Sequence, residues 1–235
     1  MGRAFEKRKT QKMARWSQIS KAFTRIGKEI AISVKLGGPD PVSNPRLRMA
    51  IQNAKAVNMP KEKVENAIKR ASNKEEKDFN EVVYEGYGPN AVAIVVECAT
   101  DNPTRTVANL RTYFNKNNGA LGKTGSLDFL FERQGVFTIH KGTIDPEEIE
   151  LELIDFGAEE VEGDGDEIYI YTAFESFGIM QKALEDKGIE VIKAELQRFP
   201  LNTVALTEEQ EEQVNKLLEK LEEDDDVQQV FHNMA

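Results

Sequence analysis

The sequence predicts an α+β protein in which an N-terminal helical bundle precedes two α/β domains, one of them inserted into the other. The first indication is charge. Residues 1–80 carry 19 Lys and Arg against 8 Asp and Glu, a net +11, whereas residues 81–235 carry 12 against 33, a net −21. The second is a change from helical to strand-like hydrophobic spacing near residue 80. The third is the element order β-α-β-β-α-β within residues 133–200, which is typical of a ferredoxin-like fold.

The first 16 residues are rich in positive charge and include two aromatic residues, Phe5 and Trp16. They show little apolar periodicity, so we expect a partly mobile arm. A basic arm can follow a phosphate backbone, and an aromatic ring can stack on an unpaired base. The alternative role for Trp16 is a hydrophobic anchor that holds the arm to the next helix.

Three amphipathic helices are expected after the arm, with these apolar stripes: Ile19, Phe23, Ile26, Ile30 and Val34; Leu47, Ile51 and Ala54; Val64, Ile68 and Ala71. The first ends at Gly37-Gly38-Pro39. The second begins at Asn44-Pro45, a capping residue followed by proline in the first turn. Its N-terminus, beside Arg46 and Arg48, is a candidate anion site. A helix-turn-helix is an alternative, although no helix stands out as a recognition helix.

The basic unit is the candidate nucleic-acid-binding part of the chain, because Lys and Arg neutralise phosphates and release counterions. A solvated helical surface is the alternative explanation of this charge. The candidate contact residues come from the arm and the first two helices: Arg3, Lys7, Arg8, Lys9, Lys12, Arg15, Trp16, Lys21, Arg25, Lys28, Lys35, Arg46 and Arg48.

Strand-like spacing begins after a polar linker at residues 72–78. Residues 91–96 predict a strand, a helix follows Pro103, and residues 127–131 predict a second strand. Beyond Pro200, Thr207 is expected to cap an acidic helix that leads to a strand at Val227–Phe231. We expect this tail to complete the sheet begun at residues 82–131.

The inserted module has six expected elements within residues 133–200: a strand at 135–139, a helix from Pro146, a hairpin of 159–162 with 168–171, a helix around 177–184 and a strand at 191–194. The predicted domains are therefore residues 1–80, residues 81–132 together with 201–235, and residues 133–200.

No pattern in the sequence predicts an active site, a metal site or a cofactor. Gly119, Gly122 and Gly125 could suggest a phosphate loop, but a helix C-cap and turn fits the following strand better. Residues 163–167 fit a polar hairpin tip better than a calcium loop. The acidic run 222–226 is either a solvated face or a docking surface for a basic partner. Cys98 lies in an apolar strand and is expected in the core.

The bulk composition favours a globular protein of the cytoplasm. No apolar run approaches the ~20 residues that cross a bilayer, and the basic N-terminus lacks the apolar region of a secretory signal. One cysteine cannot form an internal disulfide and suits a reducing compartment. We therefore expect no membrane partner and no small-molecule substrate.

Several blocks, in order along the chain, resemble the YebC/PmpR family: Asn44-Pro45-Arg46-Leu47-Arg48, Asn58-Met59-Pro60, Ala67-Ile68-Lys69-Arg70, Tyr84-Glu85-Gly86-Tyr87-Gly88-Pro89, Thr100-Asp101-Asn102, Arg105-Thr106-Val107 and Asp225-Asp226-Val227-Gln228. Two places depart from the family pattern. Gly2-Arg3-Ala4-Phe5 replaces the usual His-Ser-Lys-Trp opening, and Leu127-Asp128-Phe129 replaces a Val, a small residue and Tyr. The arm is thus divergent.

The resemblance implies a three-domain, non-enzymatic regulator of gene expression. Family members include DNA-binding transcriptional regulators, ribosome-associated factors that aid translation of difficult sequences such as proline runs, and a mitochondrial translational activator of cytochrome oxidase. DNA is the expected partner and ribosomal RNA the alternative, since both present the same phosphates. An enzyme that acts through an acidic cleft between the α/β units is the alternative of a different class.

Overall fold

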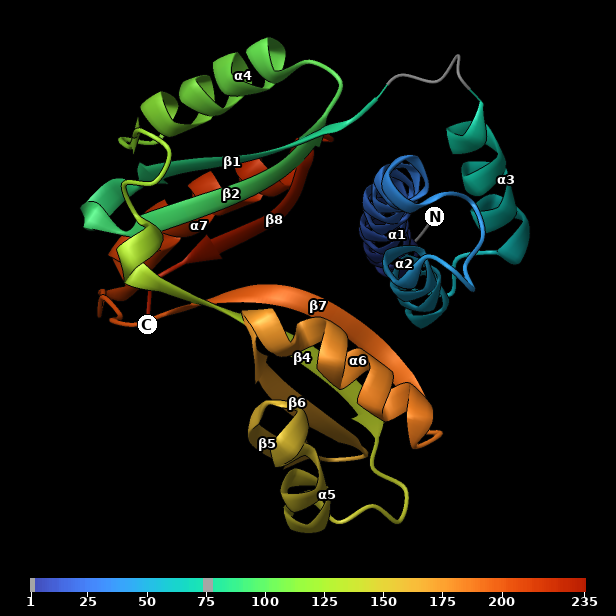
Figure 1. Ribbon diagram of the computed structural model, residues 1–235. Helices are drawn as coiled ribbons and strands as arrows, with labels where there is room; N and C mark the ends of the chain where they lie inside the picture. Colours follow the sequence, from blue (N-terminus) through green and yellow to red (C-terminus); the bar gives the residue numbers. More distant parts are fainter. Residues whose placement is uncertain (1–2, 74–77) are drawn as a thin grey trace. The chain divides into compact units, whose positions relative to one another are not determined.

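A computed structural model describes the backbone of residues 3–73 and 78–235, with side chains from residue 19 onward in the first helix. The chain forms two compact units, residues 1–79 and residues 80–235. The predicted α+β class is confirmed: the first unit is helical, and the second contains two antiparallel sheets with their own helices (Figure 1).

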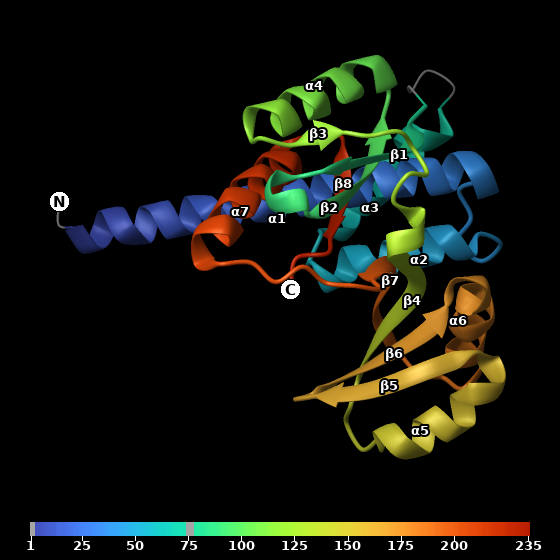
Figure 2. The same ribbon diagram turned by 90° about the vertical axis from the view of Figure 1, so that its left-hand side faces the viewer.

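The helical unit consists of α1 (Arg3–Gly37), α2 (Pro45–Ala56) and α3 (Lys61–Ser72). The prediction of an arm over the first 16 residues is wrong for the backbone, which is helical from Arg3. Dense Lys and Arg disrupt apolar periodicity but retain good helix propensity, so the segment continues the helix that follows it. Figure 2 shows this first part of α1 running beyond α2 and α3.

The predicted stripes meet in one core, except at the start of the first stripe, where Ile19 is 38% exposed and Phe23 is only partly buried. Ile30, Leu47 and Ala54 are fully buried, with Val64 and Ala71 close to it. Asn44 caps α2 as predicted, because its side-chain oxygen accepts from the N–H of Leu47 at 3.0 Å. The same buried side chain donates to the carbonyls of Ser33 and Gly38, both at 2.8 Å. Asn44 therefore joins the end of α1 to the start of α2.

The first sheet of the second unit has the strand order β3-β1-β2-β8. Its strands are β1 (Asn80–Tyr87), β2 (Ala93–Thr100), β3 (Ala120–Leu121) and β8 (Val227–His232). β1 pairs antiparallel with β2 from Asn80↔Thr100 to Tyr87↔Ala93. β8 pairs antiparallel with the other edge of β2, which confirms that the tail returns to this sheet.

Helices α4 (Pro103–Lys116) and α7 (Glu208–Glu223) cover one face of this sheet. Leu110 and Phe114 of α4 and Leu217 of α7 are fully buried against Ile94 and other β2 side chains. The buried residues on the opposite face, around Val95, include Leu127 and Phe131 from the segment that leads into the second sheet. Cys98 is buried in the first of these cores, as expected.

The second sheet has the order β5-β6-β4-β7 and all its pairs are antiparallel. Its elements are β4 (Phe131–His140), α5 (Pro146–Leu153), β5 (Ala158–Asp164), β6 (Glu167–Ala173), α6 (Phe177–Asp186) and β7 (Val191–Pro200). This is the predicted βαββαβ arrangement, including the hairpin between β5 and β6. The rings of Phe137 on β4 and Phe177 on α6 stack with centroids 4.7 Å apart.

The predicted strand at residues 127–131 is wrong. Asp128–Leu130 is a 3-10 turn, and the strand begins at Phe131 and runs to His140. The apolar residues that suggested a strand are buried for another reason, because Leu127 and Phe131 pack on the first sheet. β4 thus starts before residue 133, while the division into domains at 81–132, 133–200 and 201–235 stays a prediction.

Candidate nucleic-acid interface

Seven of the candidate contact residues lie on the first turns of α1: Arg3, Lys7, Arg8, Lys9, Lys12, Arg15 and Trp16. Their side chains are outside the part of the chain that the structure describes. The alternatives for Trp16, base stacking or a hydrophobic anchor, therefore both stay predictions. The backbone places the positive charges of this segment at helical spacing along α1.

Two candidate lysines of α1 are engaged within the helical unit. Lys28, expected to contact nucleic acid, is buried, and its Nζ lies 5.3 Å from the centre of the Phe79 ring. Lys35 forms an ion pair of 3.0 Å with Asp78. The partners, Phe79 and Asp78, follow α3 in the chain, so the spacing of residues within α1 could not predict these contacts. Lys21 and Arg25, also on α1, are partly exposed.

The N-terminus of α2 is more occupied than the anion-site prediction assumed. Arg48 Nη1 donates to the carbonyls of Pro41 and Val42, each at 2.8 Å, and so braces the loop before the helix. Asn44 already accepts from the N–H of Leu47. Pro45 has no N–H to offer. Arg46, partly exposed at the same helix end, stays a predicted contact residue.

Sequence reasoning missed three cations of α3: Lys63, Lys69 and Arg70 line a groove that α3 forms with α1. Their side chains belong to exposed residues, and Lys63 Nζ lies 5.0 Å from the centre of the Phe23 ring. The signal for Lys63 and Arg70 was present, because positions 63, 66, 67 and 70 recur at helical spacing on one face of α3. The predicted apolar stripe, Val64, Ile68 and Ala71, marks a different face of this helix.

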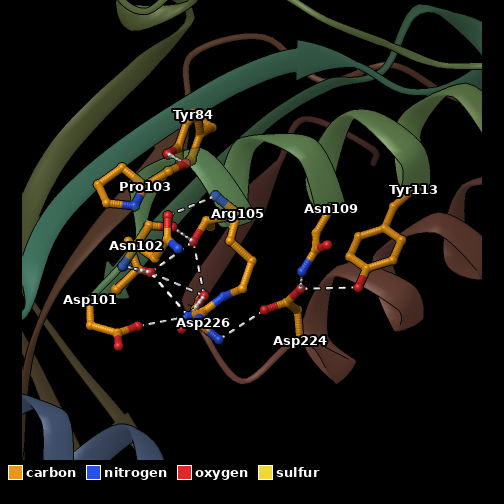
Figure 3. Close-up of polar contacts among 11 residues, drawn as sticks. Tyr84, Asp101, Asn102, Pro103, Arg105, Asn109, Tyr113, Asp224 and Asp226 are labelled. Atoms are coloured by element: carbon orange, nitrogen blue, oxygen red, sulfur yellow. Dashed lines mark hydrogen bonds and ion pairs between the residues drawn. The ribbon is translucent and has the colours of Figure 1, made fainter.

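A polar cluster in the second unit is centred on Asp226, just before β8 (Figure 3). Its side chain is 7% exposed. Its Oδ2 lies 3.1 Å from the Thr100 hydroxyl, 2.9 Å from the Thr106 hydroxyl and 2.7 Å from Arg105 Nη2. Arg105 also pairs with Asp101 at 2.9 Å. Buried charge of this kind is stable only when such donors surround it, so the cluster fixes the start of β8 against β2 and α4.

A second carboxylate extends the cluster along α4. Asp224 Oδ2 accepts from Tyr113 at 3.0 Å and Asn109 at 3.2 Å, as Figure 3 shows. Burial and this hydrogen bond to Asp224 raise the pKa of Tyr113 to about 12.

The raised pKa predicts a loss of stability in alkali. Unfolded tyrosine releases its proton near pH 10, whereas folded Tyr113 keeps it until about pH 12. The stabilisation is therefore fully present below pH 10 and declines as pH rises toward 12. Urea unfolding between pH 9 and 12 should show a shallower decline for Tyr113→Phe than for the parent. Equal slopes for the two proteins would contradict this assignment.

The glycine-rich segment after α4 binds a carboxylate group of the chain itself, that of Glu85. The carboxylate of Glu85 accepts from the backbone N–H of Gly125 at 2.7 Å and of Leu127 at 2.6 Å. Glu85 is buried, at 1% exposure. The predicted turn is thus confirmed. The N–H groups of Gly125 and Leu127 hold the loop on β1 and are not open to a phosphate.

Within the described residues, no group of three or more His, Cys, Asp and Glu side chains is placed to hold a metal ion. In the same part of the chain, no helix is both long enough and apolar enough to cross a membrane.

Two family models together match nearly the whole chain. Residues 3–74 match the TACO1/YebC protein N-terminal domain, and residues 79–234 match the TACO1/YebC second and third domain. The gap between the matches, residues 75–78, lies next to the boundary between the two compact units, which falls between Phe79 and Asn80.

Relatives and a solved structure agree with these matches. A protein of Cytophaga hutchinsonii is 62% identical, over 100% of this chain and 99% of its own length. One from Flavobacterium johnsoniae is 57% identical, over 100% and 99%. Both bear the name "Probable transcriptional regulatory protein". The crystal structure of a conserved hypothetical protein of Aquifex aeolicus superposes with a TM-score of 0.79 at 41% identity, covering 93% of this chain and 90% of that one.

Proposed function

The chain belongs to the TACO1/YebC family, and we propose that it is a non-enzymatic, nucleic-acid-binding regulator of gene expression that acts on DNA as a transcriptional regulator. The observation that carries the proposal is the separation of charge, with a net +11 in residues 1–80 and −21 in residues 81–235. The names of the relatives add support, since both are called transcriptional regulatory proteins.

The charge separation favours a directed mode of binding. Phosphates attract the helical unit and repel the acidic unit, so only the helical unit enters the nucleic acid. Contacts of Lys and Arg with phosphates fix position and carry little sequence information. In this mode the acidic unit stays away from the phosphates, where other molecules can contact it.

Ribosomal RNA is the second candidate target, for a ribosome-associated factor that aids translation of difficult sequences such as proline runs. The observation that favours it is the presence of aromatic side chains, Phe23 and Phe79, beneath the lysines of the helical unit. Aromatic rings stack on unpaired bases, and folded RNA presents such bases in loops and bulges. Either target places the protein in the cytoplasm, a compartment that suits the single buried Cys98.

Crosslinking in living cells, with sequencing of both recovered DNA and recovered RNA, separates the two targets. Discrete promoter peaks that survive treatment with RNase are expected for the transcriptional regulator. Enrichment confined to ribosomal RNA, without promoter peaks, would replace the DNA target with the ribosome. Recovery of neither nucleic acid would overturn the proposed function as a whole.

A further inference from the structure

We propose that the groove between α1 and α3 of the helical unit binds unpaired bases of a single-stranded nucleic acid. The inference rests on the proposed function, because it names the form of nucleic acid that the basic unit takes. It concerns base contacts in one defined groove, whereas the charge argument above concerns phosphates alone.

The groove has the size and the lining that a base requires. Its volume is about 1000 Å³, at the upper end of the ~300–1,000 Å³ of pockets that bury drug-sized molecules, so more than one base fits. Small residues on the two helices, Gly27, Ala31 and Ala67, leave this space, and Phe23 and Phe79 add aromatic surface. A Cβ atom added at Gly27 would meet nothing within 4 Å, which shows that the space above the helix is open.

In the described part of the chain, the charged residues that line the groove are all positive. The described residues that line it include Lys28, Lys63, Lys69 and Arg70, and none of the described lining residues is Asp or Glu. The Nζ atoms of Lys28 and Lys63 lie 5.3 Å and 5.0 Å from the centres of the Phe79 and Phe23 rings. An apolar, aromatic groove with a cationic border is complementary to a strand that carries apolar base faces on an anionic backbone.

The amides of Asn66 and Asn73 add polar groups to the same lining. Amide groups can donate to and accept from the edges of an unpaired base. A duplex keeps its bases stacked and paired, and a base must leave the stack before it can enter a groove of this kind. Duplex DNA can therefore meet the cations through its phosphates while the groove itself stays unused.

Filling the groove at Gly27 tests the proposal without cutting into the core. Gly27→Leu places a side chain in open space and replaces glycine within a helix by a better helix former. Gly178→Leu is the matched control, because Gly178 is also in a helix, α6 of the other unit, and also has nothing within 4 Å of an added Cβ. Fluorescence anisotropy of the full chain is measured with a labelled single strand of mixed sequence and with the duplex made from it.

The expected result is that Gly27→Leu raises the Kd for the single strand about fivefold or more, since stacking contributes strongly for each base. The Kd for the duplex should stay within about twofold, and Gly178→Leu should match the parent on both probes. If the parent and both variants bind the single strand equally, the groove is not its site. If the parent binds neither probe, the proposed function falls together with the inference.

Sedimentation of the proteins without nucleic acid tests the other candidate occupant of the groove, a second copy of the chain. Gly27→Leu and the parent are expected to sediment as the same species at the concentrations used for binding. A parent that dimerises and a variant that does not would assign the groove to the second copy and overturn the proposal.

Discussion

A chain reduced to residues 80–235 is expected to lose at least about hundredfold in affinity for nucleic acid relative to the full chain. The removed unit holds the excess of Lys and Arg, and the part that remains carries a net −21. The remaining part should still fold, because both of its sheets and the cores around Phe114 and Phe137 lie wholly within it. Loss of binding would therefore result from removal of the helical unit and not from unfolding of residues 80–235.

Anisotropy titrations at several salt concentrations are the measurement. For the full chain, log affinity should fall with log salt at a slope of roughly −0.7 to −0.9 for each phosphate contact. The double reversal Lys69→Glu with Arg70→Glu should flatten that slope by about two contacts. Its matched control, Lys116→Glu with Lys123→Glu, changes the net charge equally within the acidic unit and should leave the slope unaltered. Undiminished affinity of residues 80–235 would contradict the assignment of binding to the helical unit.

Asp226→Ala is expected to destabilise the second unit by about 3 kcal/mol, a large part of the ~5–15 kcal/mol that stabilises a typical protein. The substitution removes the buried acceptor of the Thr100 and Thr106 hydroxyls and of Arg105. The two hydroxyls then remain buried with fewer partners, which carries a cost for each. The hold of β8 on β2 weakens as well, because Asp226 immediately precedes that strand.

Urea unfolding followed by circular dichroism measures the change. Asp225→Ala is the matched control, since Asp225 is the exposed neighbour of Asp226 in the same turn and an exposed position usually changes stability by less than about 0.5 kcal/mol. Equal midpoints for the two variants would show that the cluster contributes nothing specific to stability. A larger loss of stability for Asp226→Ala than for Asp225→Ala, with an unchanged dependence of the unfolding free energy on urea concentration, would confirm that the cluster stabilises the second unit.

Local signals determined most of the helices and strands. Asn44-Pro45 and Thr207 begin helices where capping chemistry predicts, and the side chains of both residues make the expected cap bonds. The turn at residues 163–167 predicted the β5–β6 hairpin in the same way. These features depend on residues a few positions apart, so the sequence displays them directly. The basic character of residues 1–80 is equally a property of the sequence alone.

Tertiary structure decided the features that join distant residues. Asp226 meets Arg105 across more than a hundred residues, and Glu85 meets Gly125 across forty. Arg48 turns back onto the preceding loop, so a residue predicted to meet phosphate also braces its own unit. The groove at Gly27 exists only because α3 packs beside α1 with small residues between them. Periodicity identifies which face of a helix is buried, but the partner of each side chain is fixed only when the elements pack together.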